Sequence, residues 1–145
     1  MNPSLYLRTA LFCVSALSAP YAAADIARND LVGNWYGEGN FSAEIKTKWV
    51  TTRLENGDLL VKYRYHKNDK VLSEVLSIGT WQVVGQRYVA TYTSNNGKVE
   101  AKPQMHQYDL VSYDGTELEY RSIANERFPA TLYRVKRVQV GFELP

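Results

Sequence analysis

Apolar and polar residues alternate along the chain from Leu31 onward, and this alternation is the main structural signal in the sequence. In the stretch 43–54, for example, Ile45, Thr47 and Trp49 fall on one face, whereas charged residues occupy positions between them. A period of two is typical of a β-strand with one buried face, and no stretch has a convincing 3.6-residue helical period. The sequence therefore predicts an all-β protein.

Turn residues divide the alternation into eight strands. Asn56-Gly57 is the strongest hairpin signal, because both positions tolerate a positive φ. The strands are predicted at 31–39, 43–54, 59–66, 71–84, 87–94, 104–113, 117–123 and 128–137. Within them we expect a bulge or bend at Gly79 and Pro129 at the start of the last strand, since proline cannot donate to a ladder. Residues 25–30 are expected to form a short helical turn, and residues 98–103 to be irregular or an edge.

Short hairpins make successive strands antiparallel neighbours in space. Eight such strands with one apolar face are predicted to close into an antiparallel up-and-down barrel, which leaves no exposed sheet edge. The interior of an eight-stranded barrel is either filled by side chains or holds one small ligand. The alternative fold is a two-sheet sandwich, which usually needs longer crossover connections than this chain offers.

The N-terminal residues 1–24 have the composition of a secretory signal peptide. One cation, Arg8, precedes an apolar segment at 9–18, and alanines at 22–24 provide small residues before a cleavage site after position 24. The alternative is an N-terminal helix that stays attached. We expect an exported protein, periplasmic or secreted, whose residues 25–145 form a single domain without a transmembrane segment.

Composition and motif spacing exclude several classes of chemistry. A net charge of +2 with both signs interspersed argues against nucleic-acid binding. The single cysteine, Cys13, lies in the predicted signal peptide, so no disulfide or thiol nucleophile is expected. His66 and His106 are predicted to face opposite ways, which makes a poor metal set. No catalytic triad or phosphate-binding loop is present, so we predict no catalytic residue, metal or cofactor.

The segment Gly33-Asn34-Trp35 on the opening strand resembles the Gly-x-Trp signature of the lipocalin-like (calycin) barrels. In that family an arginine near the end of the last strand packs over the tryptophan and closes one end of the barrel. The resemblance implies the same role for Arg134 or Arg137, with ligand entry from the opposite end. The family's C-terminal helix has no counterpart here, because residues 138–145 are too few.

A narrower resemblance is to the nitrobindins, ten-stranded barrels that bind haem through a histidine near the C-terminus. Their Gly-x-Trp-x-Gly-x-Gly opening is similar to residues 33–39 of this chain. The haem-ligating histidine would fall near Arg127, and no histidine lies near that position. The departure argues against a haem site of this type.

Aromatic side chains are abundant, with 11 tyrosines and 3 tryptophans in the full sequence. The residues predicted to face inward and to contact a ligand are Trp49, Tyr63, Tyr65, Trp81, Tyr88, Tyr92, His106, Tyr108 and Tyr120. They either fill the barrel or line a cavity, where the rings contact an apolar molecule and the hydroxyls fix its polar end. His66 lies on the charged face of its strand and is expected to be solvated.

Three functions are compatible with these patterns. The first is an exported protein that binds a small hydrophobic molecule inside the barrel. The second is a solid barrel that acts through its outer surface as a protein-interaction module or inhibitor. The third is an enzyme acting on a hydrophobic substrate, with His106 and a tyrosine as the acid–base pair.

Overall fold

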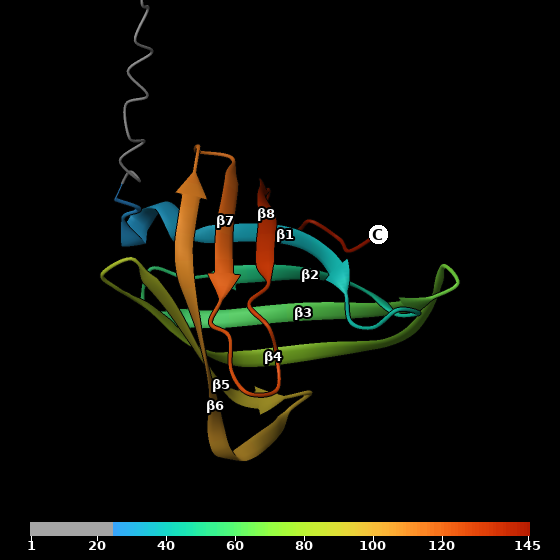
Figure 1. Ribbon diagram of the computed structural model, residues 1–145. Helices are drawn as coiled ribbons and strands as arrows, with labels where there is room; N and C mark the ends of the chain where they lie inside the picture. Colours follow the sequence, from blue (N-terminus) through green and yellow to red (C-terminus); the bar gives the residue numbers. More distant parts are fainter. Residues whose placement is uncertain (1–24) are drawn as a thin grey trace, which may run out of the picture.

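The computed structural model describes residues 25–145, which fold into a short 3₁₀-helix, η1 (Arg28–Leu31), and eight antiparallel strands (Figure 1). The strands are β1 (Gly33–Asn40), β2 (Lys46–Arg53), β3 (Asp58–Lys67), β4 (Lys70–Val84), β5 (Arg87–Asn95), β6 (Lys98–Tyr113), β7 (Glu117–Ser122) and β8 (Leu132–Val138). Each strand pairs with the next, and β8 pairs with β1 to close the barrel. The predicted up-and-down barrel is confirmed, and the sandwich is excluded. The predicted signal peptide, residues 1–24, lies outside the described residues.

The strand boundaries differ most from the prediction at the starts of β6 and β8, and β1 and β2 begin two and three residues later than predicted. Residues 98–103, expected to be irregular or an edge, instead begin β6, although the β5–β6 register shifts between Tyr92 and Ser94. Pro103, which has no N–H to donate, lies in the interrupted part of that pairing. Strand β8 begins at Leu132, so Pro129 precedes the strand. The expected irregularity at Gly79 is confirmed by a register shift between Ile78 and Gly79.

One end of the barrel is closed by η1 and by two tryptophans. Leu31 and Trp35 are fully buried, and Trp35 Nε1 donates to the Leu31 carbonyl oxygen at 2.9 Å. Trp81 Nε1 donates to the Leu54 carbonyl oxygen at 2.9 Å, and the Arg28 guanidinium lies 4.4 Å from the Trp81 ring. The helix therefore covers the base of the barrel, and the carbonyl oxygens of Leu31 and Leu54 accept hydrogen bonds from the two indole N–H groups.

Of the two arginines considered for the closure, Arg137 is the one that packs over Trp35. Its guanidinium carbon lies 4.4 Å from the ring, and Nη1 and Nη2 donate to the carbonyl oxygens of Val32 and Asp30, both at 2.8 Å. Gly33 has a φ of +117°, and a Cβ there would lie 2.8 Å from Arg137 Nη1, so a larger residue would collide with the closing arginine.

Arg134 lies on the outer face of the barrel and takes no part in the closure. Its Nε donates to Glu119 Oε1 at 2.8 Å and lies 3.1 Å from Glu117 Oε1. The register explains the difference, because Arg137 pairs directly with Trp35, whereas Arg134 pairs with Glu119 of β7. The expectation that either arginine could serve is thus narrowed to Arg137.

The residues after β8 turn at 140–141 and then run along the outside of the barrel. Phe142 packs against Tyr36 with ring centroids 5.1 Å apart, and Arg64 donates to the Leu144 carbonyl oxygen. Leu144 is buried as a result. Within residues 25–145, no helix is long and apolar enough to cross a membrane.

Candidate functional site: a cavity inside the barrel

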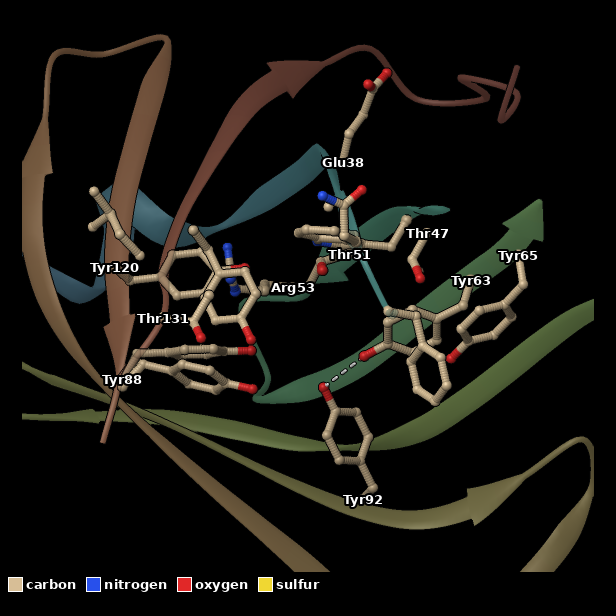
Figure 2. Close-up of a pocket in the computed structure, with 17 residues that line it drawn as sticks. Glu38, Thr47, Thr51, Arg53, Tyr63, Tyr65, Tyr88, Tyr92, Tyr120 and Thr131 are labelled. Atoms are coloured by element: carbon tan, nitrogen blue, oxygen red, sulfur yellow. Dashed lines mark hydrogen bonds between the residues drawn. The ribbon is translucent and has the colours of Figure 1, made fainter. Parts of the chain in front are cut away.

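The barrel encloses a cavity of about 300 Å³ (Figure 2). This volume lies at the lower end of the range typical of small-molecule sites, about 300–1,000 Å³. Its lining residues are Glu38, Gly39, Asn40, Phe41, Thr47, Trp49, Thr51, Arg53, Tyr63, Tyr65, Tyr88, Tyr92, Tyr108, Tyr120, Thr131, Leu132 and Tyr133. The described barrel is therefore not a solid one.

The cavity opens at the end away from Trp35. Its lining includes the last residues of β1, the first part of β2 and the first residues of β8. These segments share one rim because β1 pairs antiparallel with both β2 and β8. Phe41 and Leu132 on this rim are exposed, whereas Trp35 at the opposite end is fully buried. A molecule would enter between the β1–β2 turn and the segment that leads into β8.

Trp49 lies across β1, over the glycines of the opening motif. A Cβ at Gly37 would lie 2.5 Å from Trp49 Cε2 and 2.8 Å from Val135 Cγ1. At Gly39 the nearest atom would be Trp49 Cζ3 at 3.4 Å. Tyr133 packs edge-on against the indole, with ring centroids 6.0 Å apart. The glycines thus leave room for one wall of the cavity, a role that follows from the register of β1 against β2.

Two groups of tyrosines form most of the remaining wall. In one group, which extends from the base toward the rim, the rings of Tyr88, Tyr108, Tyr120 and Tyr133 pack against one another with centroids 5.2–6.1 Å apart. Nearer the rim, the hydroxyls of Tyr63 and Tyr92 are 3.5 Å apart, as the dashed line in Figure 2 marks.

Burial disfavours ionisation of four of these hydroxyls. It raises the pKa of several tyrosines above the ordinary value of 10.0, namely Tyr63, Tyr92, Tyr108 and Tyr120. A neutral phenol can donate one hydrogen bond and accept others. The part of the wall that these tyrosines form is therefore aromatic, uncharged and able to hydrogen-bond.

Arg53, at the end of β2, contributes a cation to this wall. It is 1% exposed, and its guanidinium carbon lies 4.4 Å from the Tyr88 ring centroid and 6.0 Å from that of Tyr120. Burial disfavours the charged form of Arg53, and the faces of the neutral Tyr88 and Tyr120 rings favour it. Among the described residues, neither Arg53 Nε nor Nη1 has a hydrogen-bond partner. Thr47 Oγ1, on the same face of β2, is also buried and unpartnered there.

Of the nine residues predicted to contact a ligand, seven line the cavity and two do not. Trp81 is inward and buried, but it fills the base beside η1. His106 is exposed and packs edge-on against Tyr92 of the lining, with ring centroids 5.4 Å apart. Its expected position inside the barrel is wrong because β7 pairs with β6 only from Tyr108 onward, so His106 lies beyond the closed wall.

His66 also differs from its prediction. Expected to be solvated, it is only 9% exposed. The β3–β4 register shifts between Tyr65 and His66, which interrupts the alternation on which the expectation depended. The lining residues that were not predicted to contact a ligand include Arg53, Thr47, Thr51 and Tyr133. The signal for the first three was present, because they continue the inward alternation through Trp49, but a charged residue is rarely assigned to an interior face.

Among residues 25–145, no group of three or more His, Cys, Asp or Glu side chains is placed to hold a metal ion. The sequence matches no protein-family model and no curated protein. The eight-stranded closed barrel is consistent with a lipocalin-like fold. The likeness rests on the fold, the Gly-x-Trp motif and the Trp35–Arg137 closure.

Proposed function

We propose that the protein is an exported, lipocalin-like binding protein that holds one small hydrophobic molecule in the barrel. The observation that carries this proposal is the cavity, whose rings come from most strands of the barrel and which is closed at one end and open at the other. A mostly apolar pocket with a few convergent polar groups is the usual form of a small-molecule site.

The cavity volume limits the size of the ligand. About 300 Å³ equals the volume of roughly ten water molecules, each taking ~30 Å³ in the liquid. Since a methylene group and a water molecule are of similar size, a ligand of about ten non-hydrogen atoms would fill the space. A long acyl chain or a haem would extend beyond this space through the open end. The proposed ligand is therefore a short-chain or single-ring compound.

The two alternative functions have less support. A solid interaction module does not require a cavity of this size. The enzyme hypothesis depended on His106 as an acid–base group, and His106 does not line the cavity. Export is supported by the composition of residues 1–24 and is tested by N-terminal sequencing of protein recovered outside the cytoplasm, which should begin at Asp25.

The binding proposal is tested by titrating the protein with 1-octanol and following tryptophan fluorescence, because Trp49 lines the cavity. Native mass spectrometry of freshly isolated protein would identify any molecule that co-purifies. Thr47→Phe, which places a ring inside the cavity near its rim, should abolish binding. Thr52→Phe, the same substitution on the opposite face of β2, should leave binding intact. Equal affinities of these two variants for octanol would contradict the proposal.

A further inference from the structure

The buried guanidinium of Arg53 has an unmet electrostatic requirement. A buried cation is normally paired with an anion and fully hydrogen-bonded, because removing it from water is costly. Among the described residues no carboxylate forms a salt bridge with Arg53, and Nε and Nη1 lack hydrogen-bond partners. Within residues 25–145, the acidic residue in the cavity lining is Glu38. It is exposed at the rim and accepts a hydrogen bond from the Tyr36 hydroxyl.

Arg53 lies at the inner end of the cavity. In the β1–β2 pairing it is opposite Gly33, next to the Trp35 closure, whereas Thr47 is opposite Gly39 near the rim. The Tyr88 ring faces the guanidinium at 4.4 Å, an arrangement that suits a cation–π contact and leaves the in-plane N–H groups for another partner. The floor of the cavity is thus cationic and the wall above it aromatic.

We propose that Arg53 binds the carboxylate of the ligand, so that the natural occupant is a small amphipathic monocarboxylate. Its head lies on the floor at Arg53, and its apolar body extends along the tyrosines toward the rim. A carboxylate accepts two hydrogen bonds from one guanidinium and neutralises its single positive charge. A phosphate dianion would leave excess negative charge among neutral tyrosines, which the single cation of the wall does not balance.

This inference rests on the proposed function, since it names the chemical class of the molecule held in the same cavity. It predicts that an anionic head raises affinity beyond what the apolar body provides. If Arg53 were satisfied by buried water alone, a neutral ligand of equal length would bind as tightly as the acid. The comparison of an acid with its alcohol therefore separates the two cases.

The test is calorimetric titration with octanoate and with 1-octanol, which share the apolar chain and have about ten non-hydrogen atoms, as the cavity allows. Octanoate should bind at least about tenfold more tightly than octanol, equivalent to ~1.4 kcal/mol. In Arg53→Met the ratio should fall to about one through loss of octanoate affinity alone. Arg134→Met, which removes an exposed arginine on the outer face, should leave the ratio unchanged.

The outcomes separate the inference from the proposed function. If octanol binds as tightly as octanoate, or if Arg53→Met weakens both equally, the carboxylate assignment is overturned while binding stands. If neither compound binds, the proposed function fails and the inference fails with it. If Arg53→Met does not fold, the carboxylate assignment is tested with the original protein. Its affinity for octanoate must fall as the pH drops through the pKa of the ligand's carboxyl group, whereas its affinity for octanol must stay constant. A parallel decline of both would overturn the assignment.

Discussion

Replacing Gly37 with alanine is expected to push Trp49 into the cavity. The new Cβ would lie 2.5 Å from Trp49 Cε2 and 2.8 Å from Val135 Cγ1, well inside ordinary contact. Tyr133 packs edge-on against the same indole, and the β1 backbone lies beneath it. Since Trp49 otherwise faces the cavity, that is the direction left for the ring to move.

The matched control is Gly39→Ala on the same strand. Its Cβ would meet Trp49 Cζ3 at 3.4 Å, an ordinary contact. Both substitutions reduce the freedom of the unfolded chain, a gain of ~0.4–1 kcal/mol that cancels in the comparison. The remaining difference is the overpacking cost at Gly37, about 1–3 kcal/mol. For a domain of this size, 1 kcal/mol shifts Tm by roughly 4 °C.

The assay is thermal unfolding followed by circular dichroism, together with octanol binding. Gly37→Ala should melt about 4–12 °C below Gly39→Ala, from the overpacking cost and the Tm scaling above. It should also bind octanol more weakly, because the displaced indole occupies part of the cavity. Unfolding free energies within about 0.5 kcal/mol of each other, the usual scatter of neutral substitutions, would refute the argument that Gly37 makes room for Trp49.

Three further predictions concern the closure, the buried tyrosines and His106. Arg137→Met should lower the unfolding free energy in urea by about 2 kcal/mol, because it loses hydrogen bonds to three backbone carbonyl oxygens and to the Tyr113 hydroxyl, as well as the Trp35 contact. Arg134→Met should lower the unfolding free energy much less than Arg137→Met, since only exposed ion pairs are lost, and equal losses for the two variants would contradict the assignment of the closure to Arg137. Above pH ~10 the free energy of unfolding should fall, because tyrosines ionise in the unfolded chain while their raised pKa values keep the buried ones protonated in the barrel. If all tyrosines of the native protein showed tyrosinate absorbance near pH ~10, this prediction would be wrong. His106→Ala should leave octanol affinity unchanged in calorimetry, and a loss of affinity would place His106 in the site after all.

The strands of the barrel could be predicted because their signals are local. Alternation with a period of two and turns such as Asn56-Gly57 depend on residues close in sequence, and both appear in the structure at the expected places. Hairpins between neighbours then imply the order of the strands. The errors at 98–103 and at His66 fall where the register shifts, and a shift depends on two strands together.

The site depended on contacts that only the tertiary structure determines. The sequence offered two arginines for the closure, and the register that pairs Arg137 with Trp35 decided between them. It placed nine ring-bearing residues on the inward face, but which of them line a cavity, and whether their packing leaves about 300 Å³, depends on every ring at once. His106 followed the same alternation and lies outside, because β7 ends before reaching it. Arg53 was readable as inward, yet the absence of a partner among residues 25–145 emerges only when the surrounding strands are in place.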